Sequence, residues 1–267
     1  MLTNSAVNSS YDARDYHICA ATELPASYKC PVTVRVKNQG SKPTCTAHAT
    51  ASVVEYHYKR QHDNTYKSFS TEFIYGFRDV GYYVGDGMCI RDALKTIQKY
   101  GDCFKTDCPG NNDVDKAMNT VSSNIDKYKE LAYPNRVSSY YRCKTIDEIK
   151  TALVTHGPVL ASMNTYNGAK IVDDVYTYDP EADHGRHCVM IYGYDDRGWL
   201  VQNSWGDLWA GDGRFTLPYD YNLNEAWGVS DDILEDNVVS KPSKLPAFIY
   251  KLFNHIVNWF MSLKKDS

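Results

Sequence analysis

Three short motifs that lie far apart in the sequence constrain the fold of this chain more than any other feature. The motifs are residues 36–49, 185–194 and 199–206. They contain Gln39 and Cys45, then His187, then Asn203. Cysteine-based acyl transfer needs four such groups: a thiol, an imidazole, an amide that orients the imidazole and an amide that receives negative charge. The chain is therefore expected to bring the region around residue 45 next to the region around residues 187–203.

Cys45 is predicted to begin a helix and to act as the nucleophile. Small residues follow it and give way to apolar residues at helical spacing, while Pro43 and Thr44 are typical of a helix start. A thiol attacks a carbonyl as the thiolate, so its pKa must fall from about 8.5. The dipole at the start of a helix favours an anion. His187 would add to this effect by taking the thiol proton.

His187 and Asn203 are predicted to meet across a hairpin. Residues 188–192 and 199–202 have the pattern of buried strands, and turn residues separate them. Asn203 would then bond the far ring nitrogen of His187, and Trp205 would cover that hydrogen bond. His184 is the alternative base. Because it is expected in a loop rather than at the start of a strand, His187 is favoured.

Gln39 is the candidate for stabilising negative charge. Its side-chain amide and the backbone N–H of Cys45 would form an oxyanion hole, in which loss of one donor typically costs about 10²–10³ in rate. Cys103 and Cys108 lack a second Cys/His pair, so no zinc site is expected. The reaction implies no metal and no organic cofactor.

The three motifs resemble those of the papain family of cysteine proteases. Members of that family carry Gln-Gly-Ser before the Cys, a buried strand that opens with His, and Asn-Ser-Trp-Gly, in that order. The resemblance covers roughly residues 30–230 and implies an α+β fold of two domains, a helical left domain and a β-barrel-like right domain with the active-site cleft between them. The boundaries so expected are a leader at 1–30 and a catalytic domain at 31–235, with its left part at about 40–135 and its right part at about 136–230.

The same resemblance implies a cysteine-type peptidase that hydrolyses peptide bonds through a thioester on Cys45, with His187 as general base and acid. An amidase or acyl transferase with the same catalytic set is an alternative, and so is a catalytically silent binding protein with this fold. The intact catalytic set favours an enzyme. Matching the family's main specificity pocket predicts an apolar subsite, and the expected substrate-binding residues are Gly87, Met88, Ile90, Ser162, Cys188 and Trp205.

The chain departs from the family pattern at three positions near the motifs. Thr46 stands where relatives usually have Trp, and Lys42 stands where most secreted relatives have a bridging Cys. Arg186 precedes His187 where many relatives have Asp or Asn. Because a neighbouring cation disfavours a protonated imidazole, Arg186 is expected to lower the pKa of His187.

The composition restricts the expected cellular location of the chain and its expected binding partners. A net charge of −4 gives no nucleic-acid signature, so the expected partner is a peptide or protein substrate. Of eight cysteines, seven remain beside Cys45, and an odd number argues against a complete disulfide framework. The first ten residues lack a signal-peptide pattern. We therefore expect a cytoplasmic location or one peripheral to a membrane, without a long helical propeptide.

The last part of the sequence is expected to be an appendage. Residues 236–244 have the composition of a linker, and residues 245–267 place apolar side chains on one helical face. An amphipathic helix with a Trp and terminal lysines suits a membrane surface. Docking on the catalytic domain or on a partner is the alternative.

Overall fold

The computed structural model describes residues 6–10, 12, 15–78, 85–108 and 121–231. Contacts divide the chain into a first unit of residues 1–231 and a second unit of residues 232–267. The predicted linker at 236–244 and the predicted helix at 245–267 lie outside the described residues. The structure below is that of the first unit.

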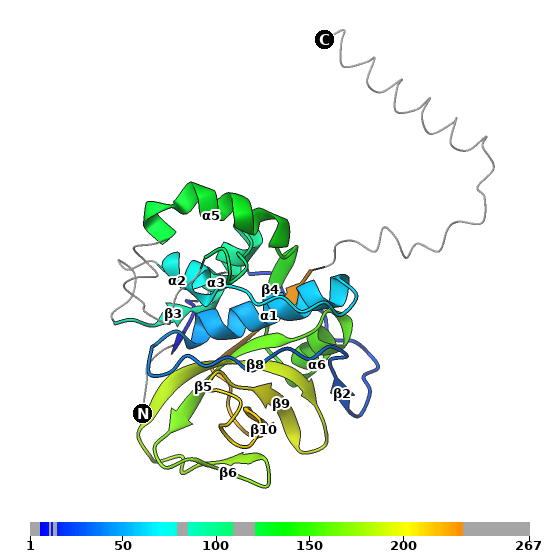
Figure 1. Cartoon of the computed structure of the whole chain (residues 1–267). Helices are drawn as coiled ribbons and strands as arrows, with labels where there is room; N and C mark the ends of the chain where they lie inside the picture. Colours follow the sequence, from blue (N-terminus) through cyan, green and yellow to red (C-terminus); the bar gives the residue numbers. More distant parts are fainter. Residues whose placement is uncertain (1–5, 11, 13–14, 79–84, 109–120, 232–267) are drawn as a thin grey trace, which may run out of the picture. The chain divides into compact units, whose positions relative to one another are not determined.

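One long helix, α1 (Cys45–Gln61), lies at the centre of this unit (Figure 1). Thr44 is its N-cap, which confirms the predicted helix start. Its side chains are buried from Cys45 through His57, as expected for a helix that is covered on all sides. Two cations, Lys59 and Arg60, occupy the last turn, where they complement the negative end of the helix dipole.

The other helices are shorter, and their first turns show ordinary capping. Ser70 accepts the N–H of Phe73 at the start of α2, and Thr145 accepts that of Glu148 at the start of α6. In Figure 1, α2, α3 and α5 lie on one side of α1, and β5, β8, β9, β10 and β6 of the large sheet lie on the other. The bounds are α2 (Thr71–Gly76), α3 (Ile90–Lys99), α5 (Ile125–Ala132), the 3₁₀ helix η1 (Tyr133–Asn135) and α6 (Ile146–Thr155).

The large sheet is mainly antiparallel and carries the two later motifs. Its strand order is β4-β11-β5-β8-β9-β10-β7-β6, with β2 pairing to β8. Residues 195–197 join β8 to the antiparallel β9, which confirms the predicted hairpin. The bounds are β2 (Tyr28–Lys29), β4 (Ser139–Cys143), β5 (Val159–Tyr166), β6 (Lys170–Val172), β7 (Val175–Thr177), β8 (His184–Tyr194), β9 (Gly198–Gln202), β10 (Arg214–Pro218) and β11 (Glu225–Ser230).

One prediction about this sheet is wrong. His184 was expected in a loop, but it is the first residue of β8. The partner strand β5 continues to Tyr166, which pairs with His184, so the ladder extends three residues before His187. The His184 side chain is exposed and packs edge-on against the Tyr166 ring.

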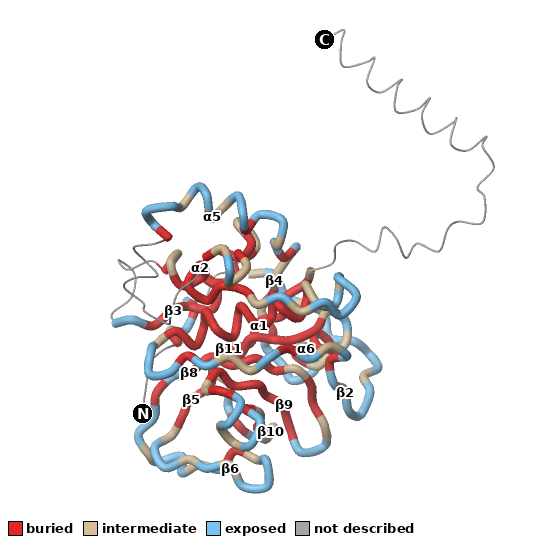
Figure 2. Tube along the Cα trace, viewed as in Figure 1, coloured by how far each residue is buried: buried red, intermediate tan, exposed pale blue. Residues whose placement is uncertain are grey.

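The core lies between α1 and the sheet. Figure 2 shows α1 and the neighbouring strands buried, whereas α5 and the loops around β6 and β2 are largely exposed. Leu160, Ile191 and Trp199 are among the fully buried side chains of this core. A smaller cluster around Phe73 and Val121 fills the space beneath α5. Within the described residues, every helix is too short or too polar to cross a membrane.

The N-terminal segment belongs to this body. A short strand, β1 (Ala6–Val7), pairs in parallel with β3 (Met88–Cys89), which leads directly into α3. Ala6 is only 2% exposed. The predicted leader at 1–30 is therefore packed on the domain over the part that the structure describes.

Candidate active site

Cys45 occupies the first position of α1 and contacts strand β8. The backbone N–H of Cys188 donates to Cys45 Sγ at 3.3 Å. His187 immediately precedes Cys188 in β8. The helix start and the strand thus place the thiol and the imidazole on adjoining pieces of backbone, although they are far apart in sequence.

His187 is held by Asn203, which follows directly after β9. The His187 Nε2 to Asn203 Oδ1 distance is 2.7 Å, and Asn203 Oδ1 also accepts the backbone N–H of Ser204 at 2.8 Å. An amide oxygen only accepts hydrogen bonds, so Nε2 carries the proton and Nδ1 presents its lone pair. The indole of Trp205 covers the imidazole, with ring centroids 4.7 Å apart and planes tilted by 31°.

Burial favours the neutral form of the His187 imidazole. His187 is 1% exposed, and burial lowers its pKa to about 4, against the opposing effect of the hydrogen bond to Asn203. Nδ1 has no hydrogen-bond partner among the described residues. A buried nitrogen with a lone pair, on the residue before the one that bonds Cys45 Sγ, is suited to accept a proton.

The expected cause of this pKa shift is wrong. The pKa of His187 is lowered, but through burial rather than through the charge of Arg186. Successive strand positions face opposite sides of a sheet. The Arg186 side chain is exposed on the other side of β8 from the imidazole.

Gln39 is fixed in the loop before α1. Its backbone N–H donates to the Ser204 carbonyl at 2.9 Å, and its Oε1 accepts the Ser204 hydroxyl at 2.6 Å. Nε2 donates to the Lys42 carbonyl at 2.7 Å. Because an amide nitrogen carries two hydrogens, one remains for an oxyanion. Gln39 is 1% exposed, so its orientation is set by these contacts.

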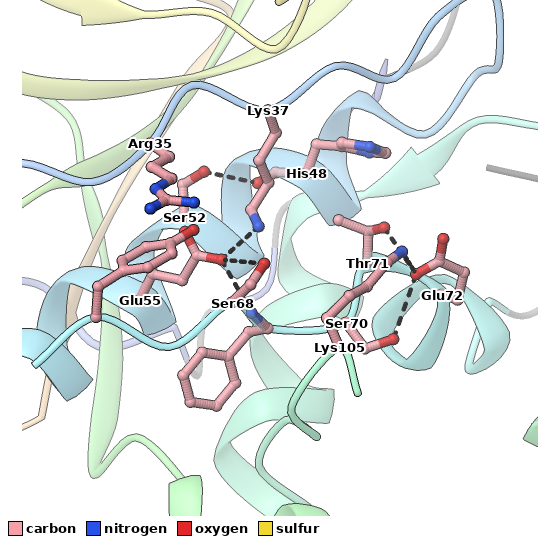
Figure 3. Close-up of polar contacts among 12 residues, drawn as sticks. Arg35, Lys37, His48, Ser52, Glu55, Ser68, Ser70, Thr71, Glu72 and Lys105 are labelled. Carbon is pink, nitrogen blue, oxygen red and sulfur yellow. Dashed lines mark hydrogen bonds and ion pairs between the residues drawn. The ribbon is translucent and has the colours of Figure 1, made fainter. Parts of the chain in front are cut away.

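A buried carboxylate on α1 anchors the Gln39 loop (Figure 3). Glu55 is fully buried and accepts the Lys37 ammonium at 2.5 Å, the Phe69 N–H at 2.9 Å and the hydroxyls of Tyr66 and Ser68 at 3.2 and 3.3 Å. Lys37 lies two residues before Gln39, so the ion pair ties the loop to the helix. Sequence reasoning missed this role. A single acidic residue in the otherwise apolar, small-residue run after Cys45 was the available signal.

A second buried polar group lies beside the first (Figure 3). Lys105 forms an ion pair with Glu72, whose carboxylate also accepts the hydroxyls of Ser70 and Thr71. His48, in the first turn of α1, has its Nδ1 2.9 Å from the Thr44 carbonyl. These contacts surround the beginning of the helix that carries Cys45.

Four of the predicted substrate-binding residues lie on four elements, β3, α3, β5 and β8. Met88, Ile90, Ser162 and Cys188 are fully buried, and Ser162 pairs with Cys188 across β5 and β8. The hydroxyl of Thr46, the residue after Cys45, donates to the Met88 carbonyl at 2.9 Å. The Gly87 carbonyl accepts from Arg78 Nε at 2.6 Å. Trp205 instead lies over His187.

Glu225 lies near these predicted substrate-binding residues, and sequence reasoning missed it. It pairs with Ser162 across β11 and β5, in the same row as Cys188, and its charge raises the pKa of the Cys188 thiol, after the larger effects of burial and of Cys45. Its Oε2 accepts the Trp227 indole N–H at 2.9 Å. A carboxylate therefore adjoins a region that was expected to be apolar. No local motif marked it.

The described residues contain no group of three or more His, Cys, Asp or Glu side chains that could hold a metal ion. All eight cysteines lie within them and carry free thiols.

Comparisons with known proteins agree on one family. The model for papain family cysteine proteases matches residues 22–234. An uncharacterized peptidase C1-like protein of Acanthamoeba polyphaga mimivirus is 27% identical over 207 residues, covering 70% of this chain and 65% of the relative. Mouse cathepsin K is 24% identical over 211 residues, covering 73% of this chain and 59% of the relative. The chain thus spans less than two thirds of these relatives.

Among solved structures, the crystal structure of xylellain, a cysteine protease from Xylella fastidiosa, has a TM-score of 0.74. It is 24% identical, and the match covers 86% of this chain and 97% of that structure. Procathepsin L 3 from the larval midgut of Tenebrio molitor gives a TM-score of 0.63 at 20% identity, covering 81% of this chain and 73% of that structure. At these identities the likeness shows the fold, which is the predicted papain-like α+β fold.

Proposed function

Because the chain belongs to the papain family of cysteine proteases, we propose that it hydrolyses peptide bonds through a thioester on Cys45. The observation that carries this proposal is the arrangement of three groups: Cys45 at the start of α1, His187 on β8 and Asn203 directly after β9. Asn203 fixes the His187 ring through Nε2, Nδ1 is left as a buried acceptor, and the residue after His187 bonds Cys45 Sγ. Other uses of a buried Cys do not need a fixed imidazole.

In the first half of the reaction, Cys45 Sγ attacks the carbonyl carbon of the scissile bond. His187 Nδ1 takes the thiol proton and delivers it to the leaving amine, so the C–N bond breaks and the acyl group stays on sulfur. The negative oxygen that develops would be received by the Cys45 backbone N–H and by the remaining hydrogen of Gln39 Nε2.

In the second half, water attacks the thioester. His187 accepts a proton from that water and returns one to the departing sulfur, which restores the thiol and releases a carboxylic acid. Asn203 contributes by holding one tautomer of the ring through both steps. Trp205 covers the hydrogen bond from His187 to Asn203 and keeps water away from it.

The test compares peptide cleavage and thiol labelling in matched variants. Cys45→Ser and His187→Ala should abolish cleavage and labelling by an epoxide thiol-protease inhibitor. Gln39→Ala should lower kcat/KM by about 10²–10³. Cys103→Ser, at a fully buried cysteine outside the site, is the control and should remain active. Full cleavage activity in His187→Ala would reject the proposal.

The same catalytic set also suits an amidase or acyl transferase, because the acceptor of the acyl group is chosen by the surroundings of the thiol. Mass spectrometry of the products, with an added primary amine, separates the two. Carboxylic acid as the main product supports hydrolysis, and an amide as the main product supports transfer.

A further inference from the structure

A polar cavity of about 480 Å³ lies beside the loop that leads to Gln39 (Figure 3). Its lining includes Lys37 and Asn38 of that loop, His48 of α1, and Lys105 of the segment after α3. Of the described residues that line it, none is a catalytic candidate or a predicted substrate-binding residue. The cavity is therefore formed by residues other than those of the proposed active site.

Two ammonium groups in the cavity are held in place by buried carboxylates. Glu55 is fully buried and accepts Lys37 Nζ at 2.5 Å, and Glu72, which is 3% exposed, accepts Lys105 Nζ. An ammonium group carries three hydrogens. Within the described residues each of these two groups has one hydrogen-bond partner, so N–H donors remain for a ligand. Because the carboxylates already restrict both lysines, a ligand would lose less free energy by ordering them.

Arg35 supplies a third cation that lacks a carboxylate partner. Its guanidinium lies over the Tyr66 ring, 4.8 Å from the ring centroid, and forms no ion pair within the described residues. Among the lining residues and their ion-pair partners, three cations thus face two carboxylates, which leaves an excess of positive charge. A guanidinium can donate two parallel N–H bonds to one oxyanion. The cavity therefore favours an anionic ligand with several acceptor oxygens.

His48 makes the cavity sensitive to pH. Its Nδ1 lies 2.9 Å from the Thr44 carbonyl, so in the neutral ring Nδ1 carries the proton and Nε2 is the nitrogen left for a ligand. Burial lowers the pKa of His48 to about 4. The charges of Lys37 and Lys105 also lower this pKa, whereas the charge of Glu72 raises it. A bound anion would offset the two lysines and favour the protonated ring, which would then donate from Nε2.

We propose that this cavity binds a dianionic tetrahedral oxyanion through Arg35, Lys37 and Lys105, either as the phosphate group of a small phosphomonoester or as free phosphate. Binding of the anion and protonation of His48 then favour each other. The cavity is larger than one phosphate group, so the organic part of an ester has room beside it. Binding at this site does not require peptide cleavage and is independent of the proposed function.

The test is isothermal titration calorimetry of the full chain with sodium sulfate at pH 7 and pH 5, at an ionic strength held constant with sodium chloride. Sulfate keeps two negative charges at both pH values. Arg35→Gln removes the guanidinium without leaving a carboxylate unpaired. Arg136→Gln is the matched control, because Arg136 is also exposed and lies over a tyrosine ring but does not line the cavity. His48→Gln removes the titrating ring.

Arg35→Gln should weaken sulfate binding about tenfold at pH 7, as expected for the loss of one charge-assisted contact, and Arg136→Gln should bind as the wild type does. The wild type should bind sulfate about fivefold more tightly at pH 5 than at pH 7, and His48→Gln should lose this difference. No measurable binding by the wild type, equal affinities in the wild type and Arg35→Gln, or equal weakening in Arg136→Gln would overturn the site. Equal affinities of the wild type at the two pH values would overturn its coupling to His48.

Two further titrations of the wild type at pH 7 distinguish the sources of the anion. The probes are phenyl phosphate and inorganic phosphate. Tighter binding of phenyl phosphate would identify a phosphomonoester as the ligand class, because the rest of the cavity then contributes to affinity. Equal or weaker binding of phenyl phosphate would identify free phosphate.

Discussion

The acid sensitivity of this fold should depend on His48, a residue outside the catalytic set. His48 is 3% exposed, and burial lowers its pKa to about 4 against the opposing hydrogen bond to the Thr44 carbonyl, with Lys37 adding to the lowering. The folded state thus keeps a neutral imidazole where the unfolded chain, with its ordinary pKa of 6.5, takes up a proton. Stability must therefore fall as the pH falls from about 6.5 toward 4.

The size of the effect follows from the two pKa values. One pKa unit corresponds to about 1.36 kcal/mol, so the shift from 6.5 to about 4 amounts to roughly 3 kcal/mol when fully expressed. Between pH 7 and pH 5, integration of the linkage relation gives a loss of about 2 kcal/mol. This is a large part of an ordinary domain stability of about 5–15 kcal/mol.

Other buried groups also have shifted pKa values, so the wild-type curve alone is not decisive. His187 acts in the same direction as His48, because burial lowers its pKa too. Asp102 acts in the opposite direction: burial raises its pKa, the folded state holds the proton, and stability falls as the pH rises. The contributions of these groups are the same in the wild type and in a His48 variant. They therefore cancel when the unfolding free energies of the two proteins are subtracted.

The assay is urea unfolding at pH 7 and pH 5 for the wild type and for His48→Gln. Gln cannot titrate, and its side-chain N–H can still reach the Thr44 carbonyl. The wild type should lose about 2 kcal/mol more than the variant over this interval. His62→Gln, at the exposed end of the same helix, is the control and should behave as the wild type. Equal losses in the wild type and His48→Gln would refute burial as the cause.

Three further predictions follow from particular contacts. Arg186→Asn should leave the pH–rate profile unchanged, because burial sets the His187 pKa; a displaced limb would contradict this. Lys37→Met should cost about 3 kcal/mol in urea unfolding by leaving a buried carboxylate unpaired, whereas Lys95→Met, in an exposed pair, should cost under about 1 kcal/mol. Gly101→Ala should cost more than about 3 kcal/mol, since φ is +84° and the new Cβ would lie 2.0 Å from the Ala132 carbonyl oxygen. Gly168→Ala is the control, because Gly168 has φ +77° but open space around it, and it should cost only about 1 kcal/mol. Equal shifts of the melting temperature in the two variants would refute a clash at Gly101.

Local patterns in the sequence were enough to predict the elements that carry the candidate site. Pro43 and Thr44 before a run of small residues predicted the start of α1, and the two apolar runs around residues 195–198 predicted the hairpin of β8 and β9. Hydrophobic periodicity and residues typical of helix starts and turns are properties of residues that are close in the sequence. The failure at His184 was also local, because the length of a strand depends on the partner strand as well as on its own residues.

The partners of buried charges could not be predicted in this way. Glu55 and Glu225 are single acidic residues without a motif, and each becomes important through donors that arrive from distant segments, Lys37 and Ser9 among them. A carboxylate tolerates burial only when such donors converge on it. Which donors converge depends on the packing of the whole domain.

The sequence by itself determined which groups the candidate site contains: a thiol, an imidazole and two amides in the order that the papain family uses, on elements whose local signals are strong. The tertiary structure decided how these groups are buried, which charges are paired and which strands lie beside them. It buried the His187 imidazole, which lowers its pKa, fixed the Gln39 loop to α1 through an ion pair, and paired the first described residues with β3. Burial, ion pairing and strand addition all depend on which surfaces meet, and no local pattern encodes that.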